Sequence, residues 1–290
     1  MGSLAVIGWP HFLEDGGGVP ELPEVESVRR LLVGAVLNRP ILEVHCGAQQ
    51  LRRALDPDRL RTELVGARFA AVDREAKYLL MRLEGRDGAV LVHLGMTGRL
   101  LVVERERPTQ PHTHIVVGLE GGVDLRYVDV RRFGFFCWSD TPAAEPSLLK
   151  LGLDPLADGF EDRFVLQARS RGVSIKSLLM DQGVIGGVGN IYASEALWRS
   201  RVDPRRRAGQ LSARRLKSLA EAVRAVLLAA IEGGGSTIKD FVLPDGDSGG
   251  FVKLLKVYGH AGEPCVRCGE LLRKIRQAGR STFYCSKCQR

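Results

Sequence analysis

The hydrophobic periodicity of the chain changes once, near residue 150, and this change limits the possible folds to a few classes. Before it, short apolar runs of strand length alternate with turn signals such as Gly121-Gly122. The runs are Ile41–Val44, Tyr78–Leu83, Ala89–Leu94, Arg99–Val103, Ile115–Leu119 and Phe133–Trp138. Short strands with regular turns predict a β-sandwich or barrel. A helix is expected to begin at Pro23, ahead of these strands, because proline suits a first helical turn.

Beyond a stretch over 146–158 that contains proline and glycine and is typical of a linker, the apolar residues recur at helical spacing. The predicted helices are Phe164–Arg171, Ile175–Leu179, Ser194–Arg199 and Ala213–Ile231. The last helix is expected to end at Gly233, since glycine is favoured at helix C-termini. A strand-rich part followed by a helical part predicts an α+β chain.

Four of the six cysteines form two CxxC pairs near the C-terminus, separated by sixteen residues. The pairs are Cys265 with Cys268 and Cys285 with Cys288. This spacing is typical of a zinc ribbon, in which two tight turns supply four thiolates to one tetrahedral ion. Such a site has no open coordination position, so it predicts one structural Zn²⁺; a redox dithiol pair is the alternative that this spacing disfavours. Because Cys46 and Cys137 stand alone in apolar runs, we expect a reducing cytoplasm.

The chain is basic, with 42 Lys and Arg against 34 Asp and Glu, a formal net charge of +8 and a pI near 9.4. This excess suits a polyanionic partner, because cationic side chains release counterions from phosphates. A high arginine content from a GC-rich genome is the alternative explanation. No run reaches the roughly 18 apolar residues of a membrane span, and residues 1–19 lack the features of a signal peptide.

Several sequence blocks together carry a family resemblance. They are Pro20-Glu21-Leu22-Pro23-Glu24-Val25-Glu26, similar to PELPEVE; Ala76-Lys77-Tyr78-Leu79-Leu80, similar to AKYLL; His93-Leu94-Gly95-Met96-Thr97-Gly98, similar to HLGMSG; Asp129-Val130-Arg131-Arg132-Phe133-Gly134, similar to DPRRFG; and Gly187-Val188-Gly189-Asn190-Ile191-Tyr192-Ala193-Ser194-Glu195, similar to GVGNIYASE. In this order, from Pro20 to the C-terminus, they resemble the formamidopyrimidine-DNA glycosylase family (Fpg, also called MutM).

The resemblance implies a bacterial base-excision enzyme that removes oxidised purines from double-stranded DNA and then cleaves the abasic site. The expected domains are a β-sandwich with flanking helices over 20–150, a helix–two-turn–helix domain over 151–252 and a zinc finger over 253–290, preceded by a leader or misassigned start over 1–19. DNA would lie in a cleft between the halves, with the damaged nucleotide flipped out of the stack. A monomer near the nucleoid is expected.

The resemblance also implies four catalytic residues. The secondary amine of Pro20 would attack the sugar C1′ and form a Schiff base, which promotes β- and then δ-elimination. Glu21 would protonate the sugar ring oxygen. Lys77 would clamp a phosphate and assist β-elimination, and Arg280 would serve δ-elimination. Taken without the resemblance, the same residues are a helix-entry proline, a carboxylate at a helix N-terminus, a solvated lysine and one more phosphate contact.

Further residues are matched to DNA contacts. Met96, Arg131 and Phe133 would fill the void left by the flipped base, although Met96 and Phe133 alone suggest core packing. His112, Arg171, Lys176 and Asn190 would contact the DNA backbone. Asn190, in a glycine-rich turn, is expected to open a helix whose N–H groups point at phosphate. The segment Ser236–Phe251 would form a loop over the extruded lesion.

The chain departs from the family pattern at its start, because nineteen residues precede Pro20. Its nitrogen is then an amide without a nucleophilic lone pair. We expect that translation starts at Val19, read as a GUG codon, and that removal of the initiator methionine exposes Pro20. Two alternatives remain: a lesion-binding protein that does not cut, or an enzyme of the endonuclease VIII branch, which prefers oxidised pyrimidines. Leu22 and the void-filling set favour the purine branch.

Overall fold

A computed structural model describes residues 20–234 and 254–290. These residues divide into two compact units, the first over 20–149 and the second over 150–233 together with 254–290. The four-cysteine segment therefore belongs to the same unit as the helices. The leader over 1–19 and the whole of the expected lesion loop over 236–251 lie outside the described residues.

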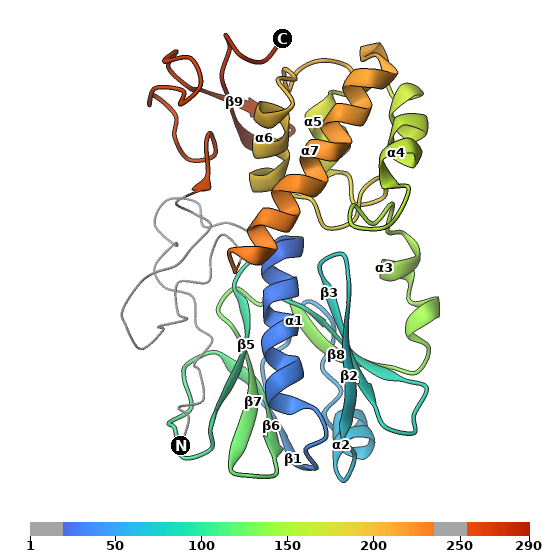
Figure 1. Ribbon diagram of the computed structural model, residues 1–290. Helices are drawn as coiled ribbons and strands as arrows, with labels where there is room; N and C mark the ends of the chain where they lie inside the picture. The colour runs from blue at the N-terminus through green and yellow to red at the C-terminus, as the bar shows by residue number, and fades with distance from the viewer. Residues whose placement is uncertain (1–19, 235–253) are drawn as a thin grey trace. The chain divides into compact units, whose positions relative to one another are not determined.

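The first unit is the predicted β-sandwich, built from two four-stranded antiparallel sheets (Figure 1). One sheet has the order β1-β6-β7-β5, with bounds Ile41–Cys46, Thr113–Leu119, Val123–Asp129 and Gly98–Glu104. The other has the order β2-β3-β4-β8, with bounds Phe69–Glu75, Tyr78–Leu83, Ala89–His93 and Phe135–Ser139. The inner faces of both sheets contribute to one core, in which Phe69, Phe136 and Tyr127 are the largest side chains.

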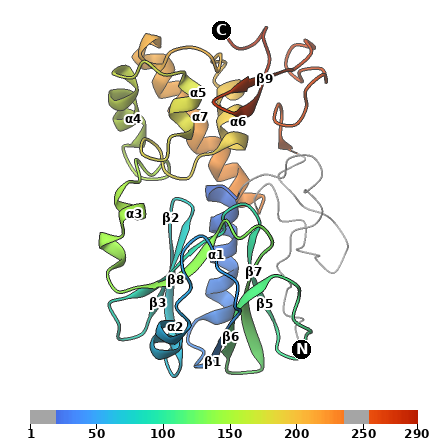
Figure 2. The same ribbon diagram turned by 180° about the vertical axis from the view of Figure 1, so that it is seen from behind.

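Two helices close the two open sides of the sandwich. Helix α1 (Leu22–Val36) contacts β2 and β5, one edge strand of each sheet, and places Val25, Val28, Leu32 and Val36 in the core. Helix α2 (Pro57–Leu64) contacts the other two edge strands, β1 and β8 (Figure 2). Covered edges cannot pair with other chains, which explains why a small sandwich carries these helices.

Sequence periodicity missed β2, β7 and α2. Strand β7 is buried along its whole length although it contains Asp124 and Arg126. The Arg126 guanidinium donates to the Asp124 carboxylate at 2.9 and 3.2 Å and to two backbone carbonyl oxygens. Because this pairing satisfies the two charges internally, the strand is buried on both faces, although its alternation of apolar and polar residues alone indicates one exposed face.

A cluster of three arginines around Glu26 joins α1 to the hairpin of β2 and β3. The Glu26 carboxylate accepts hydrogen bonds from Arg29, from Arg30 and, at 3.1 Å, from Arg74 of β2. The side chains of Glu26 and Arg74 are only 10% and 9% exposed. Arg74 also donates to the carbonyl oxygen of Ala76, at the turn that leads into Lys77. The cluster therefore holds this turn against the helix that begins just after Pro20.

Replacing Glu26 by glutamine is expected to lower the free energy of unfolding by about 1.5–3 kcal/mol at pH 7, as for hydrogen bonds to charged groups. Burial acts to raise the pKa of Glu26, but the arginines outweigh it and lower the pKa from 4.5 to about 2. The stabilisation of the fold by the Glu26 carboxylate is thus complete above pH 4.5 and is lost as the pH falls through about 2. Urea unfolding of wild type and Glu26→Gln should show a difference in the free energy of unfolding that becomes smaller towards pH 2. Glu120→Gln, at an exposed position, should hardly change the free energy of unfolding. A pH-independent effect of Glu26→Gln would contradict the stabilising role of the Glu26 charge.

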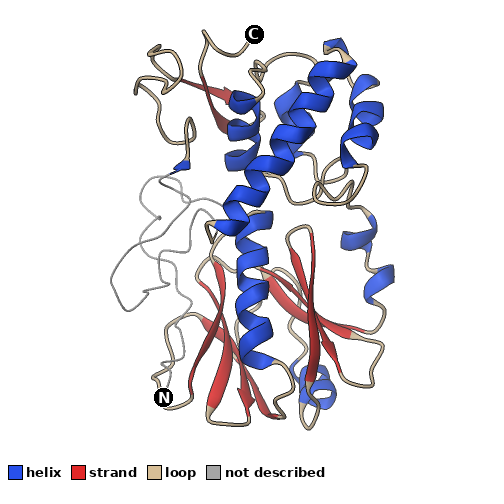
Figure 3. Ribbon diagram, in the orientation of Figure 1, coloured by secondary structure: helices blue, strands red, loops and turns tan. Residues whose placement is uncertain are grey.

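The second unit is helical, as predicted, and surrounds its own core (Figure 3). Its helices are α4 (Phe160–Arg169), α5 (Ile175–Met180), α6 (Asn190–Arg199) and α7 (Ala213–Glu232). Gly233 is the C-cap of α7, and Asn190 opens α6, both as expected. The stretch expected to be a linker contains the single-turn helix α3 (Pro146–Leu149). None of the described helices is long and apolar enough to cross a membrane.

A buried carboxylate attaches the chain leading to the cysteines to helix α6. Glu195 accepts hydrogen bonds from the backbone N–H groups of Lys256, Val257 and Tyr258 at 2.9–3.1 Å. Burial raises the pKa of Glu195, while these three N–H groups oppose the rise. Val257 is then packed with the cysteine segment, whose two strands β9 (Arg273–Gln277) and β10 (Arg280–Tyr284) form a hairpin.

Candidate functional site

The residues expected to start the chemistry lie at the beginning of α1. Pro20 is buried, and Glu21 is the N-cap, with 2% of its surface exposed. The Glu21 backbone N–H donates to the Glu24 carboxylate at 2.9 Å, and Pro23 stands in the first turn. Two carboxylates therefore share the N-terminal end of the helix, where the helix dipole favours negative charge. The side chains of Glu21 and Glu24 together form a capping box at this helix end, which is the structural role that was the alternative for Glu21.

Lys77 lies at the turn between β2 and β3 and is half-buried. The turn places Ala76 at a φ of +51°, which is uncommon for a residue with a side chain. The hydrogen bond from Arg74 to the Ala76 carbonyl oxygen stabilises this turn at 3.2 Å. The location of Lys77 is therefore fixed by the Glu26 cluster as well as by strands β2 and β3.

His93 gathers with aromatic and cationic groups at one end of the second sheet. It pairs with Tyr78 on one side and Phe135 on the other, with ring centroids 4.9 and 5.7 Å apart. Burial, followed by the charges of Arg52, Lys77 and Arg53, lowers the pKa of His93 to about 4. Its Nδ1 accepts the Gly95 N–H at 3.0 Å, so the neutral ring carries its proton on Nε2. His93 stands in one of the family motifs, but the sequence assigned it no role. Its aromatic neighbours come from other strands, and the strand register brings them together.

The three residues expected to fill the void come from two turns that lie against each other. Met96 belongs to the turn between β4 and β5, and Arg131 and Phe133 to the turn between β7 and β8. A side chain on Gly95 would come within 2.5 Å of the Gly134 nitrogen, so the two turns are in backbone contact. Phe133 is 45% exposed, and the Arg131 guanidinium stacks on its ring at 4.6 Å. Phe133 is therefore not a core residue, and the structure brings together the turns that carry all three.

His112 is exposed and adopts a φ of +64°. Its carbonyl oxygen accepts the Asp129 N–H at 3.1 Å, next to the turn that carries Arg131. In the second unit, Arg171 is exposed just after α4, and Asn190 is the first residue of the ten-residue helix α6. His112 and Arg171 are thus exposed, whereas Asn190 is half-buried.

Lys176 is placed differently from the other expected DNA contacts. It is 1% exposed, and its ammonium group donates to Asn190 Oδ1 at 2.6 Å, Thr282 Oγ1 at 2.6 Å and the Ser281 carbonyl oxygen at 3.0 Å. A lysine whose three donors are engaged in this way joins α5, the start of α6 and the β10 strand. The geometry supports a role through Asn190 and the finger hairpin.

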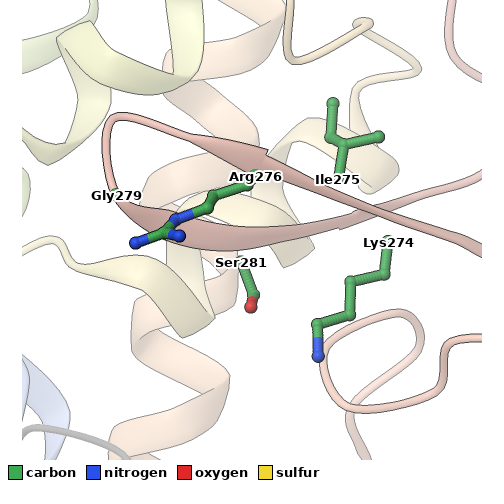
Figure 4. A pocket seen from close by; sticks show the side chains of 5 residues that line it. All are labelled: Lys274, Ile275, Arg276, Gly279 and Ser281. Carbon is green, nitrogen blue, oxygen red and sulfur yellow. The ribbon is translucent and has the colours of Figure 1, made fainter.

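The finger hairpin presents a basic surface. Arg280 is exposed at the first position of β10, directly before Ser281. A hollow on the hairpin is lined by Lys274, Ile275, Arg276, Gly279 and Ser281 (Figure 4). Figure 4 shows the Ile275 side chain pointing away from that of Lys274, as alternate residues of a strand do. The cations therefore face solvent, in a position suited to a phosphate backbone.

The four cysteines of the two CxxC pairs converge as the sequence predicted. Their sulfur atoms all lie within 4.8 Å of one another, and no other such metal-binding group occurs among residues 20–234 and 254–290. Burial opposes ionisation of Cys265, but N–H groups of Trp198, Arg267 and Cys268 outweigh it and lower its pKa to about 6. Burial and the neighbouring sulfur atoms raise the pKa of Cys288 to about 12. Four crowded thiols cannot all ionise without a cation, so this donor set fits one structural zinc ion.

Three family models match consecutive parts of the chain: the formamidopyrimidine-DNA glycosylase N-terminal domain over 19–136, its H2TH domain over 151–242, and the zinc finger found in FPG and IleRS over 262–290. Formamidopyrimidine-DNA glycosylase of Stutzerimonas stutzeri strain A1501 is 46% identical over 273 residues, which cover 94% of this chain and 100% of that protein.

Solved structures agree with these matches. A complex of the Lactococcus lactis Fpg with DNA containing an abasic site has a TM-score of 0.84 at 31% identity, covering 93% of this chain and 99% of that chain. A structure of MutM with DNA containing carbocyclic 8-oxo-G has a TM-score of 0.83 at 33% identity, covering 93% and 100%. With matched sandwich, helical domain and zinc finger, the chain belongs to the formamidopyrimidine-DNA glycosylase family.

Proposed function

We propose that this protein is a bifunctional DNA glycosylase and abasic-site lyase that excises oxidised purines, such as 8-oxoguanine and formamidopyrimidines, from double-stranded DNA. The observation that carries the proposal is the pair of contacting turns that presents Met96, Arg131 and the exposed Phe133 together. A thioether, a guanidinium and an aromatic ring can wedge into a stack, bond an orphaned base and replace the extruded one. The named complexes of Fpg and MutM with damaged DNA support it.

The chemistry begins at Pro20 in its free-amine form. The amine attacks C1′, a nitrogen–carbon bond forms, and the glycosidic bond breaks as the base leaves with the bonding electrons and takes up a proton. Glu21 gives a proton to the ring oxygen as the sugar opens, which leaves an iminium between Pro20 and C1′. Loss of a C2′ proton then expels the 3′ phosphate, assisted by Lys77, and a second elimination expels the 5′ phosphate, assisted by Arg280.

The active form begins at Pro20, because only a free secondary amine can form the iminium. One observation supports this start. The N-terminal family model matches from residue 19 onward. Val19, read as a GUG start codon and removed as methionine, would expose the proline nitrogen.

The remaining contacts follow from exposure and position. His112, Arg171 and Asn190 bind the DNA backbone, Asn190 with the help of the N–H groups at the start of α6. Lys176 acts on the DNA indirectly, by holding Asn190 and the strand that follows Arg280. The protein acts as a monomer on the DNA of the bacterial cytoplasm, and sedimentation analysis of the free protein should give the mass of a single chain.

The lesion preference decides between the purine and the pyrimidine branches of the superfamily. Protein that begins at Pro20 is expected to release 8-oxoguanine from a duplex at least ~10-fold faster than thymine glycol in single-turnover assays, the discrimination that pocket contacts commonly supply. Faster release of thymine glycol would assign the chain to the endonuclease VIII type. Tight binding of both duplexes without cleavage would instead indicate the lesion-binding alternative.

A further inference from the structure

A fully buried carboxylate lies behind the two turns that carry the void-filling residues. Asp129, the last residue of β7, has no exposed surface. Its Oδ1 accepts the Thr97 hydroxyl at 2.5 Å, and its Oδ2 accepts the Gly134 N–H at 2.8 Å and the Tyr127 hydroxyl at 3.4 Å. A buried carboxylate is stable only when such donors replace its water. These bonds join the turn of Met96, which contains Thr97, to the turn of Phe133, which ends at Gly134.

Thr97 completes the connection from the opposite side. The Thr97 hydroxyl donates its proton to Asp129, and its oxygen accepts the backbone N–H of Arg131 at 3.0 Å. One hydroxyl therefore links a residue adjacent to Met96 with the backbone of the residue that would pair with the orphaned base. Tyr127 extends the same network, because its hydroxyl also lies 3.1 Å from the His93 carbonyl oxygen, just ahead of the first turn.

The turn over 129–134 depends on these bonds for its shape. Arg132 adopts a φ of +57°, which costs energy for a residue with a side chain. Val130 stands where the related motif DPRRFG has proline, so no ring restrains the backbone at the start of this turn. Three hydrogen bonds hold it from within the sandwich: Thr97 to Asp129, Arg131 to Thr97 and Gly134 to Asp129.

We infer that Thr97 and Asp129 form a positioning pair that aligns Met96, Arg131 and Phe133 for base extrusion. The inference rests on the proposed glycosylase function. Neither side chain reaches the reacting atoms; each acts through the two turns. The pair is therefore required where an intact damaged base must leave the stack, and much less at a site that has already lost its base.

The test uses protein beginning at Pro20 and the isosteric replacement Thr97→Val, which keeps the shape and removes the hydroxyl. Excision of 8-oxoguanine under single-turnover conditions is expected to fall by roughly 10-fold or more, as expected when hydrogen bonds to a buried charge are lost. Cleavage of a duplex with a preformed abasic site is expected to stay within about twofold. Thr97→Ser, which keeps the hydroxyl, should restore excision to near the wild-type rate. The exposed Thr62→Val on α2 serves as the matched control.

Asp129→Asn gives a second route to the same pair, and melting temperatures of all variants show whether folding is affected. An equal fall in excision and abasic-site cleavage would overturn the inference, as would unchanged excision by Thr97→Val. If the wild-type protein cleaves the abasic site but excises no damaged base, the proposed glycosylase function fails, and the inference falls with it. A selective loss of excision that the serine variant rescues supports the pair.

Discussion

A chain that begins at Pro20 is expected to form a borohydride-reducible crosslink to a duplex containing 8-oxoguanine, whereas the 290-residue chain should form at least ~10³-fold less. The reason is the electronic state of one nitrogen. In the longer chain it is a tertiary amide, whose lone pair is delocalised into the preceding carbonyl group. At a chain start it is an amine whose pKa lies close enough to neutral for a substantial fraction to be unprotonated. Loss of a covalent nucleophile commonly costs this much or more.

A chain that begins at Val19 is the sharpest control, because it differs by a single residue. It has a free α-amine, but the Pro20 nitrogen is still an amide. We expect normal binding to the damaged duplex and no efficient crosslink, which separates loss of the nucleophile from loss of affinity. Crosslinking by the 290-residue chain at the rate of the Pro20 form would show that another amine performs the reaction. Mass spectrometry of the protein from native cells would identify the N-terminus that is used.

Removal of zinc is expected to unfold the cysteine segment and to weaken DNA binding by at least ~10-fold, through the loss of ordered phosphate contacts. The hydrophobic cluster of this segment is small, with Val257, Leu272 and Phe283 as its buried apolar side chains besides two cysteines. Structural zinc contributes on the order of 10–16 kcal/mol in such segments. Its loss would also leave the buried Lys176 ammonium without its acceptors on Ser281 and Thr282.

The measurement compares zinc content, circular dichroism and DNA affinity for wild type, Cys285→Ser and Cys46→Ser. Cys285 is one of the four clustered thiols, whereas Cys46 is half-buried at the end of β1, in the other unit. Cys46→Ser should therefore retain one zinc ion and full affinity. The helical core of α4 to α7 contains none of the cysteines, so most helical signal should survive in Cys285→Ser. Full DNA affinity without zinc would contradict the structural role.

Element types could be predicted where one side-chain period runs through a whole segment. The bounds of β3 and the start of α7 at Ala213 agree with the sequence expectation, because each segment has a clear strand or helix period and a distinct boundary residue. Strand β7 was not among the predicted strands although Val123, Leu125 and Tyr127 alternate with polar residues, and its Asp124 and Arg126 are buried where that alternation predicts an exposed face. Short α2 was missed as well; its signals were only the Asp56 cap and Pro57.

In the candidate site, too, local sequence patterns predicted some residues and missed the role of others. The motif blocks gave roles to Pro20, Lys77, Met96 and Phe133, but none to the polar side chains that support them, although Glu26, Thr97 and Asp129 stand in the same blocks. Arg74 reaches Glu26 across 48 positions of the chain, and Thr97 reaches Asp129 across 32. Lys176 reaches Thr282 across 106, and this contact buries the ammonium group that was expected to bind a phosphate. No local pattern encodes such pairs, because strand register and helix packing create them.

By itself, the sequence determined the order of strands and helices, the set of zinc ligands and the family, since side-chain period and ligand spacing are properties of short segments. The tertiary structure alone decided which charged and polar groups are buried and what satisfies them. Burial of Asp129, Glu26 and Lys176 is stable only with donors or acceptors from distant segments, and folding brings those partners within hydrogen-bonding distance.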